Sequence, residues 1–152
     1  MLKKYLKTNL IQLLLLSIFL VGCASRGQLE LTELNHPLSE LQGVTSTQLP
    51  VKRKYVSPNG REFRSEYFVV EEGKFAHGAQ ADTRYQAIVF ILGDRRPYRM
   101  TIQVTKESKD DHGQFRSQGS DVGLARVIKR RIQNSLHKRR DGHNIIDDFR
   151  VF

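Results

Sequence analysis

The sequence has a single cysteine, Cys23, among its 152 residues. No intrachain disulfide can therefore form, and zinc sites that use several cysteines are excluded. The five histidines lack the spacing of a zinc-protease helix, and the chain has no Gly-x-Ser-x-Gly motif and no glycine-rich phosphate loop. We therefore predict a domain held together by a packed core, with no catalytic residues, no metal site and no cofactor.

Long apolar runs are also scarce, since the main one covers only Leu10–Val21. A transmembrane helix needs about 20 apolar residues, so this run is short for that role. Three lysines precede the run, and small residues surround Cys23 at its end. This layout is typical of a secretory signal peptide, and an uncleaved interfacial anchor is the alternative. We expect residues 1–22 to be removed.

The segment Leu20-Val21-Gly22-Cys23 resembles the lipobox of bacterial lipoproteins. The resemblance implies that the Cys23 thiol receives a diacylglycerol through a thioether. It further implies that cleavage occurs just before Cys23 and that a fatty acid such as palmitate acylates the new amino group. Ala24 follows instead of aspartate, which in this class favours the outer membrane, with the domain facing the periplasm. The alternative is an ordinary signal peptide that happens to end in cysteine.

The charge of the chain is strongly positive, at +9, and removal of the three signal lysines lowers it to +6. For a cytosolic protein this excess would favour nucleic acid as the partner. Export argues against nucleic acid and favours anionic headgroups, lipopolysaccharide phosphates, peptidoglycan carboxylates or an acidic partner protein.

Composition divides the mature chain in two. Residues 23–50 are polar and interrupted by Pro37, Gly43 and Pro50, which predicts a lipidated N-terminus and a flexible tether. A short arm that docks through its leucines is the alternative. Residues 51–152 predict one α+β domain, a small antiparallel sheet of two β-hairpins plus a C-terminal strand, packed against one amphipathic helix.

The strands are predicted from alternation of apolar and polar residues and from turn residues. Residues 51–56 and 61–70 flank Asn59-Gly60, a strong hairpin signal. Residues 84–93 and 98–105 form the second predicted hairpin, and residues 71–83 and 106–120 are predicted loops. The last predicted strand covers residues 144–152. One strand alternates cleanly and points four residues into the core: Tyr98, Met100, Ile102 and Val104.

The helix is predicted from apolar residues that recur every four positions after an N-cap at Ser120 or Asp121. They are Leu124, Ile128, Ile132 and Leu136. Seven basic residues crowd the polar side and the end of this helix: Arg126, Lys129, Arg130, Arg131, Lys138, Arg139 and Arg140. They predict a surface for an anionic ligand or a partner, and a merely solubilising helix face is the alternative.

These features favour a lipid-anchored envelope protein without enzymatic activity. Its domain would bind or scaffold another component of an assembly, secretion or motility complex. One alternative is a receptor that binds an anionic envelope ligand through the basic helix. Another is a wall-acting hydrolase that uses His77, His112 and nearby carboxylates. The loop segment Asp110-Asp111-His112 has metal-ligand chemistry, but a solvated charged loop is favoured.

Overall fold

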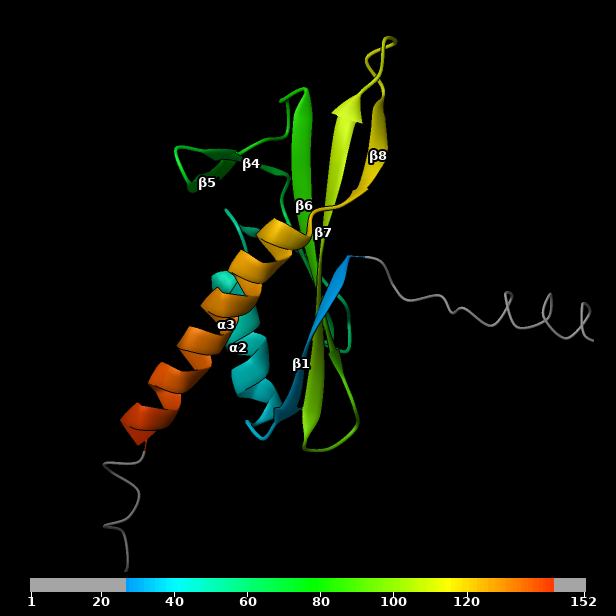
Figure 1. The fold of residues 1–152 in the computed structure, drawn as a ribbon. Helices are drawn as coiled ribbons and strands as arrows, with labels where there is room; N and C mark the ends of the chain where they lie inside the picture. Colours follow the sequence, from blue (N-terminus) through cyan, green and yellow to red (C-terminus); the bar gives the residue numbers. More distant parts are fainter. Residues whose placement is uncertain (1–26, 144–152) are drawn as a thin grey trace, which may run out of the picture.

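The computed structural model describes residues 27–143, which form an antiparallel sheet and two helices (Figure 1). In chain order the elements are β1 (Gln28–Leu34), α2 (Leu38–Gln48), β2 (Arg53–Val56), β3 (Glu62–Ser65), β4 (Phe68–Glu71), β5 (Lys74–His77), β6 (Thr83–Leu92), β7 (Tyr98–Lys109), β8 (Phe115–Ser120) and α3 (Val122–His143). The predicted α+β class is confirmed. The prediction of one helix and two hairpins is wrong in detail, because the described residues contain a second helix and additional strands.

A long hairpin of β6 and β7 forms the centre of the sheet, with pairs from Thr83–Ser108 to Leu92–Arg99. On the outer side of β7, β1 pairs with the first half of the strand and β8 with the second half. On the outer side of β6, β3 and then β2 follow, while β4 meets β6 at Tyr85. The hairpin β6–β7 corresponds to the predicted pairing of residues 84–93 and 98–105, whereas the predicted strand 61–70 divides into β3, which pairs with β2, and β4, which pairs with β5.

Both helices lie on one face of this sheet, and they run antiparallel (Figure 1). Beneath them the four alternating residues of β7 are buried, as predicted. The apolar stripe of α3 covers them, and Ile128 and Ile132 are fully buried. Each such side chain contributes about 1.5–3 kcal/mol through burial. The N-cap is Asp121, whose Oδ1 accepts a hydrogen bond of 2.9 Å from the backbone N–H of Leu124.

The segment predicted to be a tether differs most from expectation. From residue 28 onward it forms β1 and α2, and Leu31, Leu41, Val44 and Leu49 belong to the core, each at most 5% exposed. Pro37 does not interrupt α2, because it stands at the N-cap, before the first helical residue. Gly43 lowers the intrinsic helix propensity, but burial of one helix face outweighs that cost.

The two predicted loops are also partly strand. Residues 71–83 contain β5, which is joined to β4 by Glu72 and Gly73, both with positive φ as in a type I′ turn. Residues 106–120 contain the end of β7 and all of β8. Apart from Phe115, the strand residues 106–109 and 115–120 are polar or glycine, so they lack the apolar alternation on which the strand prediction depended. The predicted strand at residues 144–152 lies outside the described residues.

Candidate binding surfaces

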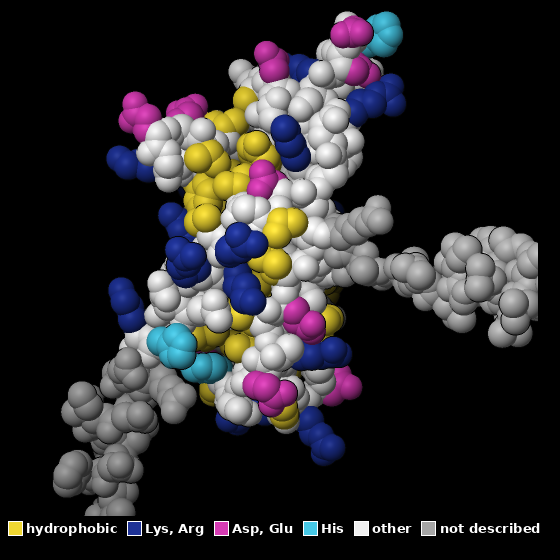
Figure 2. All heavy atoms as spheres, in the orientation of Figure 1, with side chains coloured by type: hydrophobic (Ala, Val, Ile, Leu, Met, Phe, Trp, Pro, Cys, Tyr) yellow, Lys and Arg dark blue, Asp and Glu magenta, His cyan; other side chains and the backbone are white. Residues whose placement is uncertain are grey.

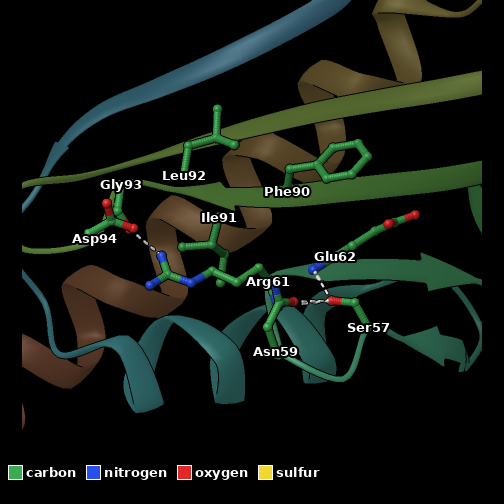
Figure 3. Close-up of a pocket in the computed structure, with 9 residues that line it drawn as sticks. All are labelled: Ser57, Asn59, Arg61, Glu62, Phe90, Ile91, Leu92, Gly93 and Asp94. Atoms are coloured by element: carbon green, nitrogen blue, oxygen red, sulfur yellow. Dashed lines mark hydrogen bonds between the residues drawn. The ribbon is translucent and has the colours of Figure 1, made fainter.

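The central strand β6 presents apolar side chains on both faces of the sheet. Ala87, Val89 and Ile91 point to the helices and are buried. Phe90 and Leu92 project from the opposite face, as Figure 3 shows, and Leu92 is 37% exposed. Within residues 27–143 no helix covers that opposite face, which we call the open face of the sheet (Figure 1).

The open face continues across neighbouring strands. Phe90 of β6 pairs with Glu62 of β3, and Ile88 pairs with Arg64. Arg64 in turn pairs with Tyr55 of the edge strand β2, and its guanidinium lies 5.7 Å from the centre of the Tyr55 ring. Tyr55 is 43% exposed. The open face therefore combines apolar and aromatic groups with charged groups.

A hollow of about 420 Å³ lies at the end of β6 beside Phe90 and Leu92 (Figure 3). Its floor is apolar, and its rim is polar. On the rim, the Arg61 guanidinium donates a hydrogen bond to the carbonyl oxygen of Gly93 and lies 5.6 Å from the centre of the Tyr98 ring. These contacts hold the Arg61 side chain in place at the rim of the hollow.

The other end of the open face is closed by Arg84. Its guanidinium lies between the rings of Tyr67 and Phe115, at 3.6 and 3.3 Å from their centres. Its Nη2 also forms an ion pair of 2.8 Å with Oε2 of Glu107. The side chain is only 14% exposed, so stacking and charge pairing act together in a partly desolvated setting. Arg84 thereby ties β6, β7 and β8 together, and the accessible part of the open face lies at Ile88, Phe90 and Leu92.

The seven basic residues of α3 do not form one continuous surface. Arg131 turns sideways, and its guanidinium lies 4.6 Å from the centre of the Phe75 ring in β5. Arg139 lies against Gly43 of α2, and Lys138 is exposed near the helix end. The side chain of Arg140 lies outside the described residues.

Three of the seven form what we call the basic face, which consists of Arg126, Lys129 and Arg130 on the first turns of α3. Arg126 and Arg130 are one turn apart and exposed, and Lys129 is half-buried on the flank of the helix. Figure 2 shows Lys and Arg side chains gathered over α3. Residues 122–140 contain no aspartate or glutamate. No ion pair within the described part of the chain involves the basic face, so its charge is available to an external anion.

The two histidines that a wall-acting hydrolase would use lie on different hairpins. His77 ends β5, with Nδ1 3.2 Å from Oε2 of Glu66, and His112 lies at the tip between β7 and β8. Both members of the His77–Glu66 pair are open to water, at 65% and 38% exposure. The structure therefore does not bring the two histidines into one site.

Asp110 stabilises the turn between β7 and β8. Its Oδ1 accepts hydrogen bonds from the backbone N–H groups of His112 and Gln114, and its Oδ2 accepts one of 2.8 Å from Arg116 Nε. The bond from Arg116, followed by the backbone bonds, lowers the pKa of the Asp110 carboxyl. Among residues 27–143, no group of three or more histidine, cysteine or acidic side chains is placed to hold a metal ion.

Sequence reasoning located the basic residues but missed the open face. The signal is present in the run from Arg84 to Gly93, whose apolar residues fall on both faces and predict a central strand, but the pattern does not tell which face a helix covers. None of the helices in residues 27–143 is long and apolar enough to cross a membrane. Comparison of the chain with protein-family models, with curated proteins and with solved structures finds no significant match.

Proposed function

We propose that this chain is a lipid-anchored envelope protein whose α+β domain binds another envelope protein through the open face of its sheet. The observation that carries the proposal is the apolar row of Ile88, Phe90 and Leu92 on that face. An antiparallel sheet covered on one side normally presents polar residues to water on the other. Three apolar side chains in a row on this face, two of them half-buried and one exposed, therefore favour a binding role over a catalytic one.

The proposed location is supported by the sequence around Cys23. A diacylglycerol thioether there would hold the domain at a bilayer, with an amino-terminal fatty acid as a second anchor. Each buried methylene contributes about 0.8 kcal/mol, so several chains together give stable attachment. The proposed location is the outer membrane, with the domain on the periplasmic side, where it would belong to an assembly, secretion or motility complex.

The partner is tested by placing a photo-crosslinking amino acid at position 90 and irradiating the native envelope. We expect a discrete protein adduct from position 90 and none from position 39, because Ser39 is exposed on α2, on the other side of the molecule. Phe90→Glu, probed through a crosslinker at position 92, should abolish that adduct while the far-ultraviolet circular dichroism spectrum stays unchanged. Identical patterns from positions 90 and 39 would count against the open face as the binding surface.

The anchor is tested by Cys23→Ser. Without the thiol the precursor cannot be lipidated, so we expect an uncleaved chain of higher mass that carries no diacylglycerol. Mass spectrometry and membrane fractionation would measure both properties, with Ser25→Ala as a neighbouring control that keeps the thiol. A variant that is processed normally and still bound to membranes would refute lipid attachment at Cys23.

A receptor for an anionic envelope ligand is a second candidate. The observation that favours it is the basic face of α3, which lacks ion-pair partners among the described residues. This role and the first are compatible, because α3, which carries the basic face, lies on one side of the sheet and the open face is the other side (Figure 1).

A further inference from the structure

The chain enters the domain beside the beginning of α3. Gly27 lies so close to Ser120 that a Cβ on Gly27 would stand 2.3 Å from the Ser120 Cβ. The next residue, Gln28, pairs with Gln103, whose side chain donates a hydrogen bond of 3.2 Å to Ser120 Oγ. Asp121 follows directly and caps α3. The point where the segment from Cys23 meets the fold is therefore next to the N-terminal end of α3.

The connection between Cys23 and this point is short. Four residue steps separate Cys23 from Gly27, and four residues span at most about 14 Å. Along α3, at 1.5 Å per residue, Arg126 stands about 8 Å and Arg130 about 14 Å beyond Asp121. A bilayer that holds a lipid on Cys23 thus lies within reach of the basic face.

The basic turn with Arg95 and Arg96 is farther from the anchor point. β1 runs from Gln28 beside Ser120 to Leu34, which pairs with Tyr98. At about 3.3 Å per residue, the turn with Arg95 and Arg96 stands about 20 Å from where the chain enters. The basic face is therefore nearer to the anchor point than the turn with Arg95 and Arg96, and its charge is unpaired within the described residues.

We propose that Arg126, Lys129 and Arg130 contact the anionic phospholipid headgroups of the membrane that holds Cys23. This inference rests on the lipid attachment in the proposed function and names a partner for the basic face. Each basic residue at an anionic surface strengthens attachment by about fivefold, and the whole helix face lacks acidic groups that would oppose it. With α3 against the bilayer, the open face, which is the side of the sheet opposite the helices, points away from the membrane and toward a partner protein.

The test separates the charge contribution from the lipid contribution. The mature chain with Cys23→Ser is mixed with vesicles of phosphatidylcholine alone or of phosphatidylcholine with phosphatidylglycerol, and the bound fraction is measured by co-sedimentation. We expect binding only to the anionic vesicles, and we expect it to weaken sharply between about 0.1 and 1 M salt. Joint replacement Arg126→Gln, Lys129→Gln and Arg130→Gln should lower the affinity by about a hundredfold.

A matched control removes the same charge elsewhere, through Lys52→Gln, Arg95→Gln and Arg96→Gln, three exposed residues outside α3. This control should bind nearly as well as the parent chain. The inference would be overturned if the two triple variants lost equal vesicle affinity, or if the parent chain bound neutral and anionic vesicles equally. It would also be overturned if the basic face bound acidic proteins and no vesicles. The lipid attachment is judged separately, by the mass and membrane fractionation of the chain that keeps Cys23.

Discussion

Leu41→Ala is expected to lower the free energy of unfolding by about 2–5 kcal/mol. Leu41 lies on α2, is fully buried, and belongs to the same hydrophobic cluster as the stripe of α3. Its truncation removes apolar contacts and leaves a cavity that the surrounding helices and sheet fill only in part. Since a domain of this size is stabilised by about 5–15 kcal/mol, the loss is a large share of the total.

The measurement is urea denaturation followed by circular dichroism, in which the midpoint should fall while the slope stays unchanged. Leu92→Ala is the matched control, because it removes the same atoms from a residue that is 37% exposed on the open face. This replacement should lower the free energy of unfolding by less than about 1 kcal/mol. If both variants lowered the free energy of unfolding by the same small amount, α2 would lie outside the cooperative unit. Residues 28–49 would then act as the tether that their composition indicated.

The misassigned segment shows what composition leaves out. Pro37, Gly43, Pro50 and several Ser and Thr residues are typical of loops. They coexist with a buried face at Leu41, Val44 and Thr45, where Thr45 is tolerated because its Oγ1 donates a hydrogen bond of 2.7 Å to the Leu41 carbonyl. Burial by α3 and the sheet outweighs local propensity, and the sequence of 28–49 alone does not contain that information.

Elements with strong local signals were predicted correctly. The Asn59-Gly60 turn, the alternating residues of β7 and the four-residue repeat of α3 each depend on neighbouring positions in the chain. In contrast, β8 pairs with β7 through mostly polar residues, and a distant residue also holds it, because Arg84 on β6 stacks on its first residue, Phe115. Such contacts join positions about thirty apart in sequence, and a periodicity argument does not detect them.

The candidate surfaces likewise include one feature that the sequence shows and one that depends on the three-dimensional packing. The basic residues of α3 are visible in the sequence, but their directions depend on contacts, since Arg131 is drawn to Phe75 and Arg139 to α2. The open face depends on where the helices pack. Because both lie on one layer, Ile88 and Phe90 remain uncovered by any helix in residues 27–143, although an apolar run usually indicates a strand buried on both sides.

Gly78→Ala is expected to destabilise the domain by about 1–3 kcal/mol, the usual cost of an added group in a site without space. A Cβ at Gly78 would stand 2.5 Å from the carbonyl carbon of Phe68 and 2.8 Å from its oxygen and from the amide nitrogen of Val69. These are backbone atoms of β4, so no side-chain rotation relieves the contact. Gly78 also donates its N–H to the Tyr67 carbonyl at 3.0 Å, which fixes its position.

Gly43→Ala provides a control with the opposite sign. Gly43 lies within α2, and the nearest atom to its added Cβ would be Arg139 Nη1, at 3.8 Å. This replacement should raise the stability by about 0.5–1 kcal/mol, because alanine loses less backbone entropy than glycine in a helix. Thermal unfolding of both variants should therefore move the midpoint in opposite directions.

The cause of the loss at Gly78 can be located as well. To accommodate the Cβ, β5 must shift from β4, and this shift disturbs Phe68, which is fully buried with its ring centre 5.0 Å from that of Phe75. Because Phe75 also carries the Arg131 guanidinium, we expect faster amide exchange at Arg131 on α3 as well as in β5. A Gly78→Ala variant with unchanged stability and unchanged exchange would show that the chain around residue 78 relaxes without moving β5, contrary to the packing described here.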